Sequence, residues 1–300
     1  MKFTVVGAGA VGKVICQTIL AHFQNIELNI HNRPKDATGL VMDLEHAGAL
    51  YNSTVSFRDM TEASEADFIF FTAGRRTKIG ESRSESAKEN QAIVRSIFEE
   101  FKPKPGAVII VISNPVESMT YWISDFLDHK NLVIGTGTAL DTVRLRSIIR
   151  LDRKVPLEKV KTMVIGEHGS TMTPIWSQTF IDEQNIHEIC SESTLERYTR
   201  ELKGSATAIR QTENATRWGV SMVSVELAKQ FLNNETKIYP ISLPAERIND
   251  ISERGLAVSW PCKIGKRRIE PLADFKMTAK EKECLNLSIQ SIKNTCLGMS

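Results

Sequence analysis

The chain has 300 residues, of which 41% are hydrophobic and 25% charged, and its formal net charge is +2. This composition is typical of a soluble globular protein of one large or two ordinary domains. The nearly balanced charge does not favour a nucleic-acid or membrane-surface partner. No apolar run reaches the roughly 18 residues that a membrane span needs. We therefore expect neither nucleic acid nor a membrane among its partners.

Cysteine usage indicates a reducing compartment. The cysteines are odd in number and lack the short spacings of metal ligands or redox pairs. The opening residues, MKFTVVGAG, lead from a short apolar run into a glycine turn, which is not the pattern of a signal peptide. We therefore expect free thiols, no metal site and a cytoplasmic protein. The five cysteines are Cys16, Cys190, Cys262, Cys284 and Cys296.

The first strand is expected at residues 3–7, followed by the turn GAGAVG and a helix over 10–23. The turn has its glycines in the spacing G-x-G-x-x-G. In such a unit the first glycine permits the tight turn, the second lets the backbone approach a pyrophosphate, and the third allows close helix–strand packing. The motif predicts a dinucleotide-binding turn formed by Gly7, Gly9, Ala10, Val11 and Gly12.

The second strand, expected at 26–30, ends without the acidic residue that such a site usually carries. An Asp or Glu about 20 residues after the glycine turn normally binds the adenosine ribose. Here His31, Asn32 and Arg33 take that place and offer hydrogen-bond donors and a positive charge. These residues would suit the additional phosphate of NADP. Alternatively, they form a solvated turn, and NAD is held by its remaining contacts.

Three more buried strands are expected at 67–74, 107–113 and 131–137, and a long helix at 84–101. Strands and helices that alternate in this way predict an α/β fold with a Rossmann-type, doubly wound parallel sheet. We assign residues 1–137 to this nucleotide-binding domain.

The pattern changes in the second half of the chain. Apolar runs at 159–166, 237–244 and 254–265 resemble strands of a more antiparallel kind, and long helical stretches lie between them. Residues 138–300 are therefore assigned to an α+β substrate domain. Its C-terminal helix has one apolar face, formed by Leu285, Ile289, Ile292 and Cys296.

Four further motifs follow the glycine turn. They are GESR (80–83), SNPVE (113–117), GTGTALDTVR (135–144) and GEHG (166–169). With these motifs in this order, the chain resembles the L-lactate/malate dehydrogenase family nearly end to end. The resemblance implies an oxidoreductase that transfers a hydride between NAD(P)H and a small 2-oxo acid, which becomes the L-2-hydroxy acid.

The resemblance also implies the catalytic roles. His168 would be the acid–base, since imidazole titrates near neutral pH. Asp141 would fix the tautomer of His168 and stabilise its imidazolium form. Arg144 would hold the substrate carboxylate in a bidentate fork, which Lys cannot reproduce. Arg83, on a loop that closes over the substrate, would polarise the carbonyl group.

Other residues would line the site by the same resemblance. Asn114, at the end of a strand, would form hydrogen bonds near the carbonyl and the cofactor. Thr216 would line the pocket beside the nicotinamide. The remaining cofactor contacts implied by the family fall on Thr72, Ala73 and Gly74.

The loop at 74–83 would read the substrate side chain, and its discriminating position falls on Thr77. Lactate dehydrogenases of the family typically carry Gln there and malate dehydrogenases Arg. Thr cannot pair with the second carboxylate of oxaloacetate, and leaving that charge unmatched costs several kcal/mol. Pyruvate is the first expectation, and the alternative is a bulkier acid, as in L-2-hydroxyisocaproate dehydrogenases. Malate stays open because Arg76 is adjacent.

Three expectations concern the cofactor, an effector and assembly. Family prevalence favours NAD, with NADP tolerated. Arg146 matches the Arg that binds fructose 1,6-bisphosphate in some bacterial lactate dehydrogenases, whereas Lys161 stands at the place of the corresponding His. The pair would form an effector anion site or serve structural and surface roles. The family implies a homo-oligomer, either a tetramer or a dimer. There are two alternatives from other classes. An NAD-dependent glycoside hydrolase would need metal ligands, and the separated cysteines do not supply an obvious set. A non-catalytic dinucleotide-binding protein is the other, and the complete set of site residues argues against it.

Overall fold

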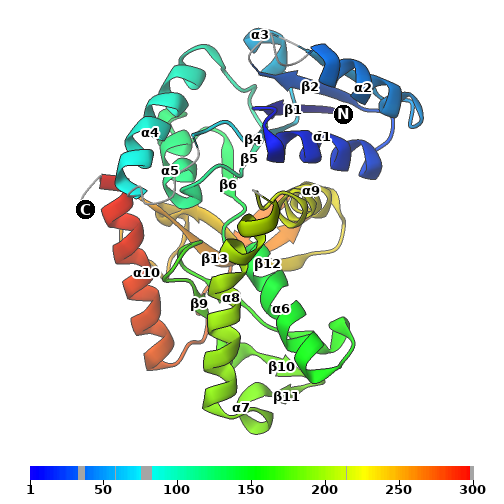
Figure 1. The fold of residues 1–300 in the computed structure, drawn as a ribbon. Coiled ribbons are helices and arrows are strands. Elements are labelled where there is room, and N and C mark those ends of the chain that lie inside the picture. Colours follow the sequence, from blue (N-terminus) through cyan, green and yellow to red (C-terminus); the bar gives the residue numbers. More distant parts are fainter. Residues whose placement is uncertain (33–37, 58, 76–82, 214, 298–300) are drawn as a thin grey trace.

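A sheet of nine strands runs through the molecule, in the order β14-β13-β12-β6-β5-β4-β1-β2-β3 (Figure 1). The computed structural model describes residues 1–32, 38–57, 59–75, 83–213 and 215–297. Six of the strands are parallel to one another and come from the first half of the chain. They are β1 (Lys2–Val6), β2 (Glu27–His31), β3 (Thr54–Phe57), β4 (Phe68–Phe71), β5 (Val108–Val111) and β6 (Leu132–Gly135).

The order of these six strands, 3-2-1-4-5-6, is that of a dinucleotide-binding sheet. The predicted doubly wound parallel sheet is therefore confirmed. The strands end earlier than the apolar runs suggest, because β4 stops at Phe71 and β5 at Val111. The residues that follow these two strands lie in loops at the carboxyl edge of the sheet, where ligands bind in such folds.

Side chains that alternate along each strand build two cores, one on each face of the sheet. On β4, Phe68 and Phe70 enter the core shared with α1 (Ala10–His22) and α9 (Trp218–Leu232). Ile69 and Phe71 point the other way and pack with α4 (Arg83–Glu100) and α5 (Val116–Phe126). Helix α9 comes from the second half of the chain, yet it lies against α1 (Figure 1).

The remaining strands of the sheet are antiparallel, as the second half of the sequence predicts. They are β12 (Lys237–Pro244), β13 (Ala257–Gly265) and β14 (Arg268–Pro271). Strand β12 joins the parallel strands through one residue pair with β6, Ser242 opposite Gly135. Strand β13 begins at Ala257, three residues later than the run expected to start at 254.

A smaller lobe carries two short sheets and a core of its own. The single strand expected over 159–166 is wrong, because its two ends pair with different partners. Strand β7 (Val160–Lys161) pairs with β10 (Phe180–Ile181), whereas β8 (Val164–Ile165) pairs with β9 (Thr173–Pro174). The other elements of this part are α6 (Ala139–Arg153), β11 (Gln184–Asn185), α7 (Ile186–Ile189) and α8 (Glu192–Glu213).

The last helix, α10 (Ala279–Leu297), buries the face that its sequence predicts. Leu285, Ile289 and Ile292 are at most 5% exposed, and Cys296 packs beside them. Two further helices are α2 (Thr38–Ala49) and α3 (Met60–Ala63). Within the described ranges, no helix combines the length and apolar character that crossing a membrane requires.

Candidate active site

The glycine turn has the geometry that its spacing predicts. Gly7 has a φ of +97°, and a Cβ there would lie 2.7 Å from the backbone N of Ala73. A Cβ at Gly12 would lie 2.0 Å from the carbonyl oxygen of Gly7, so only glycine lets α1 pack this closely. A Cβ at Gly9, by contrast, would meet no heavy atom within 4 Å. The turn is therefore closed on the protein side and open beside Gly9.

The N-terminus of α1 begins directly at this opening. Gly9 is its N-cap and has no side chain to occupy the free N–H groups, and the first turn, from Ala10, contains no acidic residue. Unsatisfied N–H groups and the helix dipole favour an anion here. This chemistry fits the pyrophosphate of a dinucleotide.

The end of β2 lies beside the glycine turn, and it carries His31 in place of a carboxylate. The carbonyl oxygen of His31 accepts a hydrogen bond from the N–H of Gly7 at 2.8 Å. The His31 ring stacks on Phe57, with the centroids 6.3 Å apart. Asn32 is half-buried, and Arg33 lies outside the described residues.

The loops after β4 and β5 are joined to each other by Asn90 of α4. Its fully buried side-chain amide donates to the carbonyl oxygens of Arg75, at 3.2 Å, and Asn114, at 2.9 Å, and its oxygen accepts from the N–H of Arg75 at 2.7 Å. The Asn114 side chain itself is exposed. Sequence reasoning missed Asn90, whose role depends on contacts 15 and 24 residues away.

The residues that would contact the cofactor after β4 are partly exposed. Thr72 and Ala73 are half-buried and Gly74 is exposed. The Thr72 hydroxyl donates to the carbonyl oxygen of Val6 at 3.2 Å and also to that of Gly7. Thr72 thus fastens this loop to the glycine turn.

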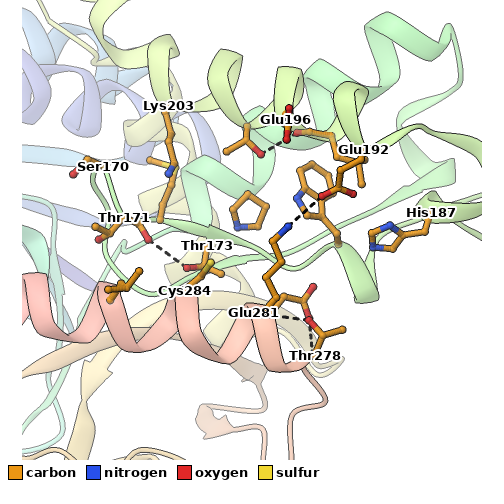
Figure 2. Close-up of a pocket in the computed structure, with 17 residues that line it drawn as sticks. Ser170, Thr171, Thr173, His187, Glu192, Glu196, Lys203, Thr278, Glu281 and Cys284 are labelled. Carbon is orange, nitrogen blue, oxygen red and sulfur yellow. Dashed lines mark hydrogen bonds and ion pairs between the residues drawn. The ribbon is translucent and has the colours of Figure 1, made fainter.

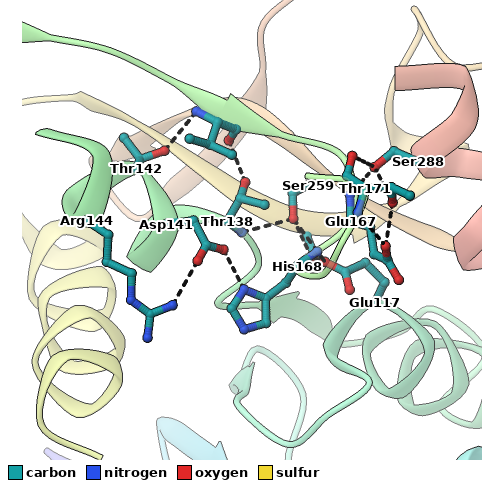
Figure 3. Close-up of polar contacts among 12 residues, drawn as sticks. Glu117, Thr138, Asp141, Thr142, Arg144, Glu167, His168, Thr171, Ser259 and Ser288 are labelled. Carbon is teal, nitrogen blue, oxygen red and sulfur yellow. Dashed lines mark hydrogen bonds and ion pairs between the residues drawn. The ribbon is translucent and has the colours of Figure 1, made fainter. Parts of the chain in front are cut away.

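His168, Asp141 and Arg144 lie together, as the sequence predicts (Figure 3). Nδ1 of His168 is 2.5 Å from Oδ2 of Asp141, and Nη1 of Arg144 donates to Oδ1 of Asp141 at 2.9 Å. The Asp141 side chain is fully buried, whereas 23% of His168 and 13% of Arg144 are exposed. Figure 3 shows Asp141 between the two cations, with the second ring nitrogen of His168 turned away from it.

The pKa shifts of this cluster favour the ionised pair. Burial opposes ionisation of Asp141, but the charges and hydrogen bonds of His168 and Arg144 prevail and lower its pKa. Burial likewise acts to lower the pKa of His168, but the Asp141 carboxylate outweighs it and raises that pKa above its usual value. Asp141 therefore favours the imidazolium form of His168, whose other ring nitrogen, Nε2, would be the one to donate a proton.

A second buried carboxylate lies beside His168. Oε1 of Glu117, at the start of α5, accepts from the backbone N–H of His168 at 3.0 Å. It also accepts from the hydroxyls of Ser242, at 3.0 Å, and Ser259, at 3.1 Å. In the sequence Glu117 is only the last residue of the motif SNPVE. Its role could not be predicted from the motif, because its serine partners lie 125 and 142 residues away in sequence.

Thr216 lies in the short connection before α9 and is half-buried. The first turns of α9 touch both parts of the site. The Ser221 hydroxyl is 3.5 Å from the carbonyl oxygen of Val11 in the glycine turn, and a Cβ at Gly219 would lie 3.0 Å from Leu140 of α6. The start of α9, which Thr216 precedes by two residues, therefore lies between the glycine turn and the helix of Asp141.

The remaining predicted site residues belong to the substrate loop and to the predicted effector site. Thr77 and Arg76 lie outside the described residues, and Arg83 is the first residue of α4, with its side chain outside the described part. The two cations of the predicted effector site have protein partners. Arg146 donates to the carbonyl oxygens of Val160 and Leu157 at 3.0 Å each, and Lys161 pairs with Glu183 at 2.5 Å.

A separate cavity of about 370 Å³ lies in the smaller lobe, between α8, α10 and residues 170–176 (Figure 2). None of the sequence-predicted site residues lines it. In the part of the chain that the structure describes, no group of three or more His, Cys, Asp or Glu side chains is placed to bind a metal ion.

Comparison with known proteins agrees with this geometry. Residues 1–134 match the NAD binding domain of the lactate/malate dehydrogenases, and residues 138–297 match the alpha/beta C-terminal domain of the same family. L-lactate dehydrogenase A of Hordeum vulgare is 30% identical over 309 residues, which cover 98% of this chain and 86% of that protein. The L-lactate dehydrogenase of Clostridium botulinum (strain Loch Maree / Type A3) is 31% identical over 308 residues, covering 98% and 95%.

A solved structure is similar over the whole chain. The minor L-lactate dehydrogenase from Enterococcus mundtii superimposes with a TM-score of 0.88 at 26% identity, and the match covers 100% of this chain and 98% of that one. The resemblance first indicated by the motifs is thereby confirmed. The chain belongs to the lactate/malate dehydrogenase family.

Proposed function

We propose that the protein is an NAD-dependent L-2-hydroxy acid dehydrogenase of the lactate dehydrogenase type. The observation that carries this proposal is the buried Asp141, which pairs with His168 at 2.5 Å and with Arg144 at 2.9 Å. The reduction of a 2-oxo acid needs a proton donor and a cation that binds the carboxylate, and Asp141 holds one candidate for each. The relatives named L-lactate dehydrogenase over nearly the full chain support the same reaction.

The glycine turn would hold the dinucleotide. The open space beside Gly9 and the uncapped, carboxylate-free start of α1 suit a pyrophosphate. Thr72 to Gly74, at the neighbouring strand end, and Asn114 after β5 would contact the rest of the cofactor. A bound reduced nicotinamide supplies the hydride for the substrate carbonyl carbon.

The side chains of the second half handle the proton and the substrate charge. His168 donates the proton from Nε2 to the carbonyl oxygen, because Nδ1 is held by Asp141. Arg144 presents its remaining guanidinium N–H groups to the substrate carboxylate as a planar fork. Arg83 and Thr216 would complete the pocket around the carbonyl group. In the reverse direction, neutral His168 accepts the hydroxyl proton.

Pyruvate is the proposed substrate, with bulkier 2-oxo acids as the second candidate. Thr77 is shorter than the Gln that lactate dehydrogenases typically carry at this position, which supports the bulkier acids as second candidates. It also provides no partner for a second carboxylate, which places oxaloacetate last. Oxaloacetate would bring an unmatched charge into the site.

NADH is the proposed cofactor, and we expect NADPH to be tolerated. A carboxylate at the end of β2 would repel the 2′-phosphate of NADPH, and His31 removes that repulsion. His31→Asp should therefore reduce kcat/KM with NADPH by at least about tenfold, or about 1.4 kcal/mol, while NADH is affected less. Equal effects on the two cofactors would contradict the role given to His31.

The test is a set of initial rates with NADH and NADPH against pyruvate, oxaloacetate, phenylpyruvate and 2-oxoisocaproate. The proposal expects turnover of pyruvate or a bulkier acid, and a loss of turnover in His168→Ala while NADH binding persists. A clear preference for oxaloacetate would overturn the substrate order. No turnover of any acid, with NADH still bound, would favour a non-catalytic dinucleotide-binding protein.

A further inference from the structure

Glu117 is a buried carboxylate that has no part in the proton transfer proposed above. It lies in the first turn of α5 and is only 3% exposed. One of its oxygens, Oε1, accepts all three hydrogen bonds, from the N–H of His168 and from the hydroxyls of Ser242 and Ser259. Figure 3 shows it directed at the turn that carries His168.

Ser259 extends this cluster to the helix of Asp141. Its hydroxyl accepts from the backbone N–H of Thr138, the residue that precedes α6, at 3.1 Å. Its backbone carbonyl oxygen accepts from the N–H of Gly166 at 2.9 Å, and its backbone N–H donates to the carbonyl oxygen of Gly166 at 3.0 Å. Gly166 lies two residues before His168. Glu117 and Ser259 therefore contact both the turn that carries His168 and the start of α6, which carries Asp141. These two segments must lie together for the His168–Asp141 hydrogen bond to form.

An acceptor at this place is needed because its donors are buried. Ser242 and Ser259 are fully buried, and their hydroxyls lie 2.9 Å apart, so only one of them can donate to the other. An apolar side chain at 117 would leave the second hydroxyl and the N–H of His168 without the acceptor that Glu117 provides. Unsatisfied buried donors are destabilising, and the turn would shift to regain a partner for them. Burial also raises the pKa of the Glu117 carboxyl above its usual value.

We propose that Glu117 is a positioning residue, which holds the backbone of His168 at the place where its ring can bond to Asp141. This inference rests on the proposed function. The required feature is the acceptor oxygen. The charged groups that act on the His168 ring include Asp141 and Arg144 from α6 and Glu117 from α5. Glu167, next to His168 in the chain, acts on Glu117.

Two substitutions at this position separate the acceptor from the side-chain shape. Glu117→Gln keeps an oxygen that accepts, whereas Glu117→Met keeps the length and removes it. Since a misplacement of about 1 Å can cost 10²-fold in rate, Met should lower kcat about 30- to 100-fold. KM for the 2-oxo acid and the Kd of NADH should stay within about twofold, because Arg144 and the glycine turn are untouched. Gln should restore kcat to within about threefold of the wild type.

A wild-type kcat in Glu117→Met would overturn the proposal. So would a loss in Glu117→Gln as large as in the Met variant, because the charge would then be the essential feature. If the Met variant does not fold, Ser259→Ala replaces it. That variant should lower kcat about three- to tenfold at unchanged KM, and a wild-type kcat there would also overturn the proposal.

A second readout does not depend on turnover. NMR titration of the His168 ring should give a raised pKa in the wild type and in Glu117→Gln, and a value shifted down in Glu117→Met as the Asp141 bond lengthens. Asp141→Asn is the reference for a lost bond. If no 2-oxo acid is turned over, the proposed function fails, but this titration still decides the role of Glu117. An unshifted pKa in the Met variant would contradict it.

Discussion

Replacing Asp141 with Asn removes the negative charge beside the His168 ring and preserves the shape of the side chain. The carboxylate is fully buried and contacts both His168 and Arg144. Asn still accepts a hydrogen bond but compensates neither cation. Asp141 is what keeps the pKa of His168 raised against burial, so we expect that pKa to fall in the variant.

The size of the effect follows from the two contacts. Hydrogen bonds to charged groups contribute about 1.5–3 kcal/mol, and breaking a buried ion pair costs about 3–5 kcal/mol. Part of that cost destabilises the ground state as much as the transition state. We therefore expect a loss of about 2–4 kcal/mol in transition-state stabilisation. At about 1.36 kcal/mol per decade, this is a fall in kcat/KM of roughly 30- to 900-fold.

The assay is the pH dependence of 2-oxo acid reduction, followed by NADH absorbance. Reduction needs the imidazolium of His168, so activity is present at low pH and is lost as pH rises through its pKa. That loss should occur at lower pH in Asp141→Asn than in the wild type. The matched control is Asp152→Asn on the same helix, whose partners Tyr198 and Arg197 are remote from the site. The pairing would be refuted if Asp141→Asn kept kcat/KM within twofold of the wild-type value and lost activity at the same pH as the wild type.

Three further predictions concern the glycine turn and the carboxylate anchor. Gly12→Ala would place a methyl group 2.0 Å from a carbonyl oxygen, and thermal unfolding should report a loss of at least about 2 kcal/mol; an unchanged Tm would contradict this packing. Gly9→Ala meets open space, so its Tm should stay near that of the wild type, while fluorescence titration should show weaker NADH binding. Unchanged binding would place the pyrophosphate elsewhere. Arg144→Lys keeps the charge without the fork, so KM for pyruvate should rise about 10- to 100-fold at an unchanged NADH Kd; an unchanged KM would assign the substrate carboxylate to another residue.

The parallel sheet could be predicted because its signals are local. The apolar run FIFF, Phe68–Phe71, is buried on both faces, and a continuous apolar run is the pattern of such a strand. The glycine spacing predicts the turn because Gly12 packs on the carbonyl oxygen of Gly7, five residues earlier, while Gly9 faces open space. The contact between Asp141 and His168 was implied by the family resemblance, and the structure places the two side chains together.

Features that depend on distant partners could not be predicted in the same way. The run 159–166 divides because Val160 and Val164 belong to strands with different partners, which the apolar pattern does not reveal. The place of Glu117 depends on two serines more than 120 residues further on. The effector expectation for Arg146 rests on the family resemblance, and neighbouring backbone carbonyls accept hydrogen bonds from its guanidinium.

The contact between α9 and α1 has a consequence for protein engineering. Residues 218–232 cover the face of α1 that carries Ile15 and Ile19, although they follow it by about two hundred positions. A chimera that takes only residues 1–137 from a relative would pair the donor's α1 with the recipient's α9, and mismatched side chains at such an interface cost stability. Transplanting a cofactor preference therefore calls for two segments, the first 137 residues and α9.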